Sequence, residues 1–268
     1  MNNLIKKYNL LKDILLSYKK VLIAFSGGVD STLLLKTAVD VLGENNVISI
    51  TLVSPLIALR NIDRVIKMSN FIGVKNFLLR IDKIEALDFS EEGERCYLCK
   101  RRMYNKLKDI AVFFDIEYIA DGSNYDDRAE YRPGRAAAVE FNIETPLEKA
   151  GILKEDVRRI LFLLSIFNWN EPSESCLATR FPTNKELTTD NLVKVELAED
   201  FIKNNGYNFV RVRTHGDIAR IELLQKDMEN FFKEGNNIKT DAYLKGLGYK
   251  YASLDLSGYR TGSMDKYG

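Results

Sequence analysis

Short apolar runs alternate with longer amphipathic stretches along the first half of the chain. Four apolar runs have the length and composition of strands: Val21–Phe25, Val47–Val53, Asn76–Leu79 and Tyr118–Asp121. The stretches beside them carry apolar residues at helical spacing, which predicts helices at Asn2–Leu16, Ser31–Leu42, Asn61–Ile72 and Lys100–Phe114. Strands as apolar as these are buried on both faces. We therefore expect an α/β fold, with a parallel sheet and helices on both of its faces.

The pattern changes after a further helix predicted at Lys154–Phe167. An irregular stretch from Trp169 to Lys185 follows it. Beyond that stretch come elements typical of a small α+β domain, namely a helix at Asp190–Asn204 and strands at Phe209–Thr214, Ala219–Leu223 and Tyr249–Leu254. The sequence therefore predicts two domains, residues 1–170 and 171–268.

Composition restricts the possible partners. The 268 residues are 46% hydrophobic and 29% charged, which is typical of a globular protein. The net charge of +1 gives no general attraction to nucleic acids or anionic membranes. The N-terminal stretch Met1–Lys20 does not resemble a secretory signal, and no apolar run is long enough to cross a membrane. With three cysteines, an odd number, we expect a cytoplasmic protein without a disulfide framework and without a membrane or nucleic-acid partner.

The segment Ser26-Gly27-Gly28-Val29-Asp30-Ser31 joins the first predicted strand to a helix. Its glycines let backbone N–H groups approach an anion, and the helix N-terminus adds partial positive charge, which is typical of a phosphate-binding loop. It is not a Walker A motif, because that motif needs a lysine before the final hydroxyl residue. The segment resembles the pyrophosphate loop (PP-loop) of the N-type ATP pyrophosphatases, which split ATP into AMP and pyrophosphate. The alternative is an ordinary strand–helix turn rich in small residues.

Ligands of parallel sheets bind beyond the carboxyl ends of the strands. Small or polar residues follow three of the predicted strands and form the expected site for ATP and Mg²⁺: Ser26, Gly27, Gly28, Asp30, Ser31, Ser54 and Gly122. We expect Asp30 to assist catalysis. Asp126 or Asp127, in the charged loop that follows, is a candidate for binding Mg²⁺ or the ribose, although such loops are more often only solvated.

Cys96 and Cys99 form a CxxC pair, and Cys176 lies far along the chain. Four interpretations are open: a structural zinc site completed by His215, a thioredoxin-like redox pair, three buried structural cysteines, or a [4Fe–4S] cluster held by three thiolates. In the last of these, one iron lacks a protein ligand and is able to bind sulfide. Activation of an oxygen atom by AMP, followed by its displacement by sulfur, would connect such a cluster to the ATP loop.

Six further segments carry a more specific resemblance: Arg95–Lys100, Asp121–Asp127, Tyr131–Gly134, Ser175–Pro182, Val210–Gly216 and Gly258–Met264. Together with the PP-loop they make the chain similar to the LarE family, the ATP-dependent sulfurtransferases that help to build the nickel-pincer nucleotide cofactor. The resemblance implies that a carboxylate of pyridinium-3,5-biscarboxylic acid mononucleotide is adenylated and then receives sulfur. In some members the cysteine matching Cys176 gives up its own sulfur, whereas members with an added CxxC are thought to use a cluster. The resemblance therefore implies that Cys96, Cys99 and Cys176 hold a [4Fe–4S] cluster, that Cys176 is catalytic and that a sulfide donor is a partner.

A nucleotide substrate with a phosphate and two carboxylates needs several cations. Arg180 lies close to Cys176, and Arg211 and Arg213 alternate along a predicted strand, so they would project from one face. We expect all three arginines to bind the substrate. The alternative for the pair on the strand is a solvated face.

Three other features suggest roles, and two of them also have a simple structural explanation. The basic run Lys100–Arg102 would lower the pKa values of the neighbouring thiols, or face water. His215 would act as a general base, or stabilise a turn before Gly216. The apolar segment Arg159–Phe167 suggests a subunit interface, and we expect a homo-oligomer.

Two rival functions remain open. A tRNA thiolase also pairs a PP-loop with a three-cysteine cluster in some families, but the near-neutral charge and the absence of an evident RNA-binding module argue against it. An amide-forming ligase of the PP-loop type would use ammonia on the adenylate, and it would leave the cysteines without a role.

Overall fold

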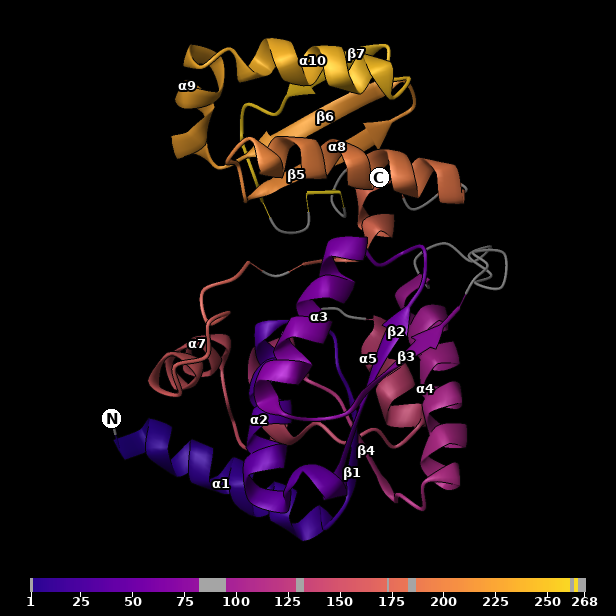
Figure 1. Ribbon diagram of the computed structural model, residues 1–268, viewed down its shortest axis with the longest axis vertical. Coiled ribbons are helices and arrows are strands. Elements are labelled where there is room, and N and C mark those ends of the chain that lie inside the picture. Colours follow the sequence, from indigo (N-terminus) through magenta and orange to yellow (C-terminus); the bar gives the residue numbers. More distant parts are fainter. Residues whose placement is uncertain are drawn as a thin grey trace. The chain divides into compact units, whose positions relative to one another are not determined.

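The computed structural model describes residues 2–81, 95–128, 133–172, 174–182, 187–260 and 263–264. It divides into two compact units, Met1–Glu174 and Ser175–Gly268 (Figure 1). Each unit has its own sheet and its own hydrophobic core.

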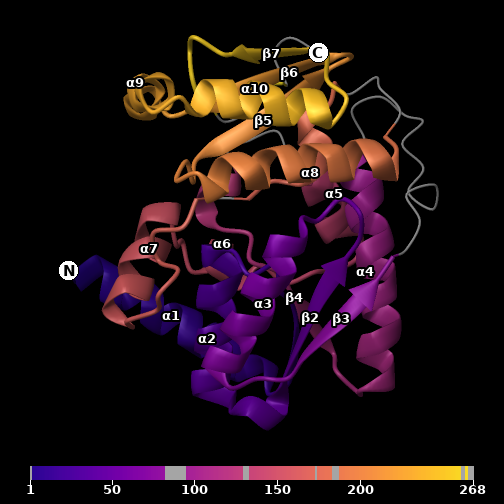
Figure 2. The ribbon, with the colours of Figure 1, turned by 45° about the horizontal axis from the view of Figure 1, so that its top comes forward.

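Unit 1 contains a four-stranded parallel sheet with the strand order β3–β2–β1–β4. The strands are β1 (Val21–Ala24), β2 (Val47–Val53), β3 (Asn76–Arg80) and β4 (Tyr118–Ala120). The helices are α1 (Asn2–Tyr18), α2 (Val29–Leu42), α3 (Leu59–Ile72), α4 (Arg95–Phe113), α5 (Pro133–Glu140), α6 (Pro146–Lys149) and α7 (Lys154–Leu163), with 3-10 turns η1 (Glu44–Asn46) and η2 (Tyr125–Arg128). Figures 1 and 2 show α2 and α3 on one face of the sheet and α4 and α5 on the other.

The alternation of side chains along β1 explains this layered arrangement. Val21 and Ile23 are buried in the core that includes residues of α1, α2 and α7, whereas Leu22 is buried in a second core with Tyr104 and Leu107 of α4. Because successive side chains of a strand point to opposite faces, the continuous apolar run is buried on both sides. The predicted α/β fold with a parallel sheet is confirmed.

Edge strand β3 is less buried than the sequence pattern suggested. Phe77 is 45% exposed and Leu78 is 37% exposed, since β3 pairs only with β2. Among the predicted helix boundaries, two differ most from the structure. Helix α4 begins at Arg95 instead of Lys100, and α7 ends at Leu163 instead of Phe167 because Ser165 adopts a positive φ of 56°.

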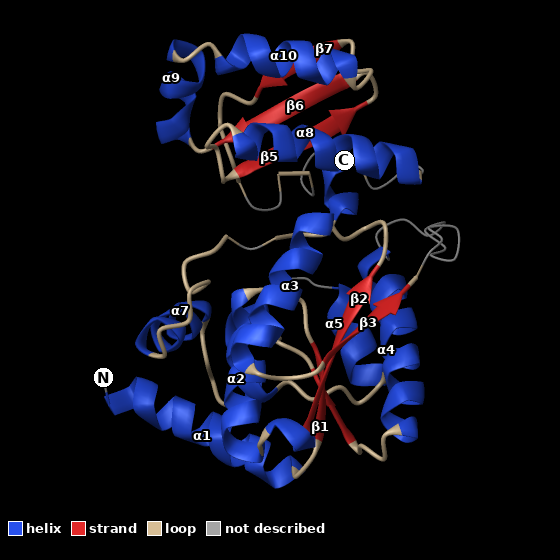
Figure 3. Ribbon diagram, in the orientation of Figure 1, coloured by secondary structure: helices blue, strands red, loops and turns tan. Residues whose placement is uncertain are grey.

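Unit 2 contains a three-stranded mixed sheet with the strand order β5–β6–β7, in which β5–β6 is antiparallel and β6–β7 is parallel (Figure 3). Its elements are η3 (Leu177–Arg180), α8 (Thr189–Asn204), β5 (Val210–His215), β6 (Ile218–Leu223), α9 (Gln225–Lys233), α10 (Asn236–Gly246) and β7 (Tyr251–Leu254). Val210 and Val212 of β5 pack in one core with Ile202 of α8 and Leu244 of α10. The chain therefore ends in the small α+β arrangement that the sequence predicted.

The helices of the described residues are all too short or too polar to span a lipid bilayer.

Candidate functional site

Contacts within the PP-loop and with α3 define the conformation of the loop. Gly27 has a φ of 72°, and a Cβ atom there would lie 2.8 Å from a methyl carbon of Val65 in α3. Ser31 Oγ donates a hydrogen bond to Gly28 O at 3.1 Å and lies 3.0 Å from Ser26 Oγ. The loop thus needs glycine at position 27, and its serines bond to one another around the N-terminus of α2.

A second strand end reaches the same place. Gly122 follows β4, and a Cβ atom on it would lie 2.8 Å from Ser31 N and 3.0 Å from Ser31 Cα. Ser54 follows β2, is buried, and accepts a hydrogen bond from Leu56 N at 3.3 Å. The structure therefore brings Gly122 against the PP-loop, whereas Ser54 stabilises a turn at the end of its own strand.

Asp30 has two side-chain partners that come from distant parts of the sequence. Asn124 Nδ2 donates to Asp30 Oδ1 at 3.1 Å, and the Lys154 ammonium forms an ion pair with Asp30 Oδ2. Sequence reasoning missed Lys154, the first residue of α7. A signal was present, because a cation at a helix N-terminus opposes the helix dipole and needs a compensating partner.

Asp126 and Asp127 stabilise the loop that carries Asn124. Asp126 Oδ2 accepts a hydrogen bond from Lys154 N at 2.7 Å, and Asp127 Oδ2 accepts one from Asn124 N at 3.0 Å. Asp126 N in turn donates to Asn124 Oδ1 at 2.9 Å. These contacts give both carboxylates a role in loop structure, and they fix the start of α7 beside the PP-loop.

Asn168 is a second residue of this site that sequence reasoning missed. It is fully buried, and its Nδ2 lies 3.1 Å from Thr32 Oγ1 and 3.4 Å from Gly27 O. Arg158 fixes the segment after Asn168, because its Nη1 donates a hydrogen bond to Trp169 O at 2.9 Å. A lone asparagine in an irregular stretch carries no sequence signal for this contact.

The CxxC pair lies in the first turn of α4. Cys96 is exposed and Cys99 is partly buried, and their separation of three residues places them on the same side of the helix. Burial and the neighbouring Cys96 raise the pKa of Cys99 to about 11, against the opposing effects of Lys100 and Arg102. Lys100 and Arg102 do act on this pKa in the expected downward direction, but desolvation of the thiolate outweighs them and the net shift is upward.

Lys100 instead reaches the sheet edge. Its ammonium lies 3.4 Å from Asp121 Oδ2, which also accepts a hydrogen bond from Tyr104 OH at 2.6 Å. Burial alone would raise the pKa of Asp121, but Lys100 and the hydrogen bonds from Tyr104 and Ser123 hold it below its usual range. The start of α4 is thereby connected to the residue that precedes Gly122.

Cys176 and Arg180 belong to unit 2. Cys176 is partly exposed and precedes η3, and Arg180, at the end of η3, is fully buried. Arg180 binds Glu199 of α8 through Nε at 2.8 Å and Nη2 at 3.1 Å, and its Nη1 donates to Ser175 O at 3.1 Å and Cys176 O at 3.2 Å. Arg180 therefore determines the shape of the turn that presents Cys176.

Arg211 and Arg213 share one face of the hairpin, and both are buried. Arg213 Nε and Nη2 bind Glu222 at 3.1 and 3.0 Å, and the guanidinium of Arg211 lies 5.3 Å from the centre of the Tyr259 ring. The alternative of a solvated strand face is wrong, since the two arginines are 2% and 5% exposed. Sequence reasoning missed Arg220, which faces Arg213 across the hairpin and would have been found from the register set by the Gly216 turn.

His215 is the last residue of β5, two positions beyond Arg213. Burial, followed by the charges of Arg220 and Arg213, lowers the pKa of His215, although Glu222 acts in the opposite direction. Burial and the two arginines thus favour the neutral form of the imidazole over the charged form.

The comparisons with known proteins agree with this geometry. The NAD synthase family profile matches residues 6–100, which include the PP-loop. The pyridinium-3,5-bisthiocarboxylic acid mononucleotide synthase of Lactiplantibacillus plantarum is 35% identical over 95% of this chain and 91% of its own length. The chain is a PP-loop ATP pyrophosphatase and belongs to the family of that synthase.

Two further relatives of this PP-loop ATP pyrophosphatase are uncharacterised proteins. One, from Synechocystis, is 37% identical over 92% of both chains. The other, from Methanocaldococcus jannaschii, is 33% identical over 97% of this chain and 98% of its own. The similarity therefore extends through both units of the structure.

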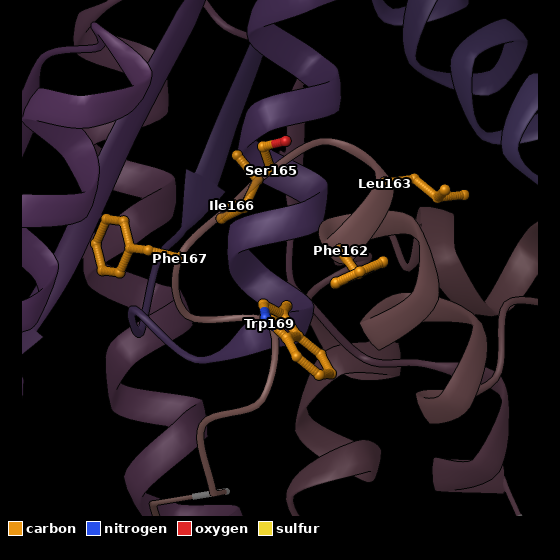
Figure 4. A pocket seen from close by; sticks show the side chains of 6 residues that line it. All are labelled: Phe162, Leu163, Ser165, Ile166, Phe167 and Trp169. Carbon is orange, nitrogen blue, oxygen red and sulfur yellow. The ribbon is translucent and has the colours of Figure 1, made fainter.

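An apolar hollow of about 450 Å³ is lined by residues in the last turn of α7 and directly after it (Figure 4). Its lining consists of Phe162, Leu163, Ser165, Ile166, Phe167 and Trp169. Apolar residues at the end of the segment Arg159–Phe167 thus line this hollow, and its lining includes no PP-loop residue.

The three cysteines are divided between the two units of the structure. Within the part of the chain that it describes, no group of three or more His, Cys, Asp or Glu side chains is placed to hold a metal ion. Cys96 and Cys99 supply two thiols of unit 1, and Cys176 belongs to unit 2.

Proposed function

We propose that this PP-loop ATP pyrophosphatase is an ATP-dependent sulfurtransferase of nickel-pincer nucleotide biosynthesis. It adenylates a carboxylate of pyridinium-3,5-biscarboxylic acid mononucleotide and replaces one of its oxygen atoms with sulfur. The observation that carries the proposal is the 35% identity, over 95% of the chain, to a synthase named for the bisthiocarboxylic product.

The adenylation half of the reaction is assigned to unit 1. A substrate carboxylate oxygen attacks the α-phosphorus of ATP, the bond to the bridging oxygen breaks, and pyrophosphate leaves with the bonding electrons. The N–H groups of the PP-loop and the N-terminus of α2 bind phosphate oxygens. Because Gly27 and Gly122 have no Cβ atoms, Gly27 packs against Val65 and Gly122 packs against Ser31, which gives the loop its shape. Asp30 would hold Mg²⁺, which screens the phosphate charges.

The sulfur-transfer half is assigned to the cysteines. A sulfur nucleophile attacks the acyl carbon, the carbon–oxygen bond to AMP breaks, and AMP leaves. Cys96, Cys99 and Cys176 would hold a [4Fe–4S] cluster, which would supply sulfide at an iron without a protein ligand. Arg180 stabilises the turn around Cys176 by donating a hydrogen bond to Cys176 O. Arg211, Arg213 and Arg220 would bind the phosphate of the substrate.

Two measurements test the proposal. Purified protein with ATP, the pyridinium biscarboxylate and a sulfide source should release AMP and pyrophosphate, and mass spectrometry should show sulfur in place of oxygen in the product. Anaerobic protein should contain about four irons and four acid-labile sulfides per chain, lost after Cys96→Ala, Cys99→Ala or Cys176→Ala. AMP release that requires tRNA, or turnover with ammonia that Cys96→Ala leaves intact, would support a rival function instead.

Absence of iron after careful reconstitution would indicate that Cys176 itself is the source of the sulfur atom. We also propose that the protein is a homo-oligomer, which sedimentation velocity tests directly.

A further inference from the structure

The PP-loop lacks the lysine that a Walker A motif provides, yet an ammonium group lies beside it. Lys154 comes from the first turn of α7, and its Nζ forms an ion pair with Asp30 in the first turn of α2. The Asp30 side chain is 19% exposed and the Lys154 side chain 32%, so the pair lies partly buried beside the loop. It is also open enough for each group to meet a ligand.

The position of Lys154 is fixed by several contacts. Its backbone N–H donates to Asp126 at 2.7 Å, and the preceding residue, Leu153, donates to Asp156 Oδ2 at 3.1 Å. Lys7 of α1 binds Asp156 as well, at 2.6 Å. These bonds hold the start of α7 while leaving the Lys154 side chain to extend toward Asp30.

The two partners are of the chemical types that a metal–triphosphate requires. Carboxylates bind Mg²⁺, and lysine binds phosphate oxygens as a point charge. The helix dipole disfavours a cation at the start of α7, so helix stability does not account for a lysine at this position. In the free protein each charge neutralises the other.

We propose that Lys154 is the pyrophosphate-binding lysine of this enzyme, and that it exchanges Asp30 for the β- and γ-phosphates when ATP and its metal ion bind. The inference rests on the adenylation half of the proposed function. Charge balance is kept, because Asp30 gains the metal ion as Lys154 gains the phosphates. When the bond from the α-phosphorus to the bridging oxygen breaks, the ammonium stabilises the charge of the departing pyrophosphate, and no proton needs to move.

Binding measurements separate this role from a structural one. Titration calorimetry would compare wild type with Lys154→Met and Lys154→Arg, using Mg²⁺ with α,β-methylene-ATP and, separately, AMP. Loss of one charge-assisted contact should weaken binding of the triphosphate analogue about 10- to 100-fold in Lys154→Met. AMP, which has no β- or γ-phosphate, should bind unchanged, and Lys154→Arg should retain most of the affinity for the analogue.

Arg159→Met is the matched control, since it removes a cation from the same helix, where Arg159 forms an exposed ion pair with Glu155. It should leave both affinities unchanged. Equal binding of the analogue by wild type and Lys154→Met would overturn the assignment, and so would an equal loss of AMP and analogue. If wild type binds no nucleotide, the adenylation proposal fails together with it, and this result is distinct from the other two.

Discussion

Removal of Glu199 should unfold unit 2 far more readily than removal of an exposed carboxylate. Glu199 and Arg180 are both fully buried, and two guanidinium nitrogens bind the two carboxylate oxygens. Glu199 Oε1 also accepts a hydrogen bond from Val212 N in β5 at 3.1 Å. Glu199→Ala therefore strands a buried cation and removes the partner of a backbone N–H group.

The cost follows from these contacts. Breaking a buried ion pair by removing one partner costs about 3–5 kcal/mol, because the remaining charge stays desolvated. A typical domain has about 5–15 kcal/mol of stability, so this change would remove a large share of it. With a denaturant dependence of about 2 kcal/mol/M, the urea midpoint of unit 2 should fall by about 1.5–2.5 M.

Hydrogen exchange followed by mass spectrometry, in increasing urea, resolves the two units. Peptides from β5 and β6 should lose protection at lower urea in Glu199→Ala, whereas fluorescence of Trp169, the single tryptophan, reports on unit 1. Glu229→Ala removes an exposed pair with Lys233 and serves as the control, with little change expected. The double variant Arg180→Met, Glu199→Met should recover part of the loss.

A loss of less than about 1 kcal/mol in Glu199→Ala would refute the reasoning, because it would mean that water or another carboxylate satisfies Arg180.

Three further predictions concern the sites. Gly122→Ala places a Cβ atom against the PP-loop backbone and should cost about 1–3 kcal/mol or abolish binding of α,β-methylene-ATP, whereas Gly246→Ala, which meets open space, should do neither. Because burial raises the pKa of Cys99 to about 11, its alkylation by iodoacetamide should accelerate up to that pH, and a midpoint near 8.5 would contradict the burial argument. His215, whose pKa is lowered first by burial and then by Arg220, should titrate below about 6.5 by NMR, and Arg220→Met should raise that pKa. Since protonation of His215 then favours the unfolded chain, stability should fall as the pH drops below about 6.5, and a titration at or above the ordinary value would refute this.

The sequence was most informative where the structure depends on the pattern of neighbouring residues. The continuous apolar run of β1 predicted burial on both faces, and Val21 and Leu22 do lie in different cores. Helix ends were less predictable, since they depend on tertiary contacts. Helix α4 includes the CxxC, although the residues of this motif have modest helix propensity. A tertiary contact is present there, because Tyr97 OH donates a hydrogen bond to Glu140 at 2.7 Å.

The end of α7 shows the same limit. Apolar spacing predicts that the helix continues to Phe167, but the chain turns at Ser165 so that Ile166 is buried and Phe167 is 53% exposed. The candidate site shows the same difference between local patterns and contacts from distant parts of the sequence. The PP-loop glycines are evident from their spacing, whereas Lys154 and Asn168 reach the loop from more than a hundred residues away.

The exposure of each ion pair indicates how readily its cation can change partner to bind a substrate anion. The sequence alone does not give this order. An anion gains affinity only by the difference between its own contacts and the pair that it displaces. The partly exposed pair of Lys154 with Asp30 costs little to open, whereas the fully buried pair of Arg180 with Glu199 would leave a desolvated carboxylate behind. Among Arg180, Arg213 and Arg220, which pair with the buried carboxylates of Glu199 and Glu222, the side chain of Arg220 is 24% exposed, against 6% for Arg213 and 0% for Arg180. Lys154 and Arg220 are therefore the cations best suited to exchange partners, and Arg180 is suited to hold the Cys176 turn throughout the reaction.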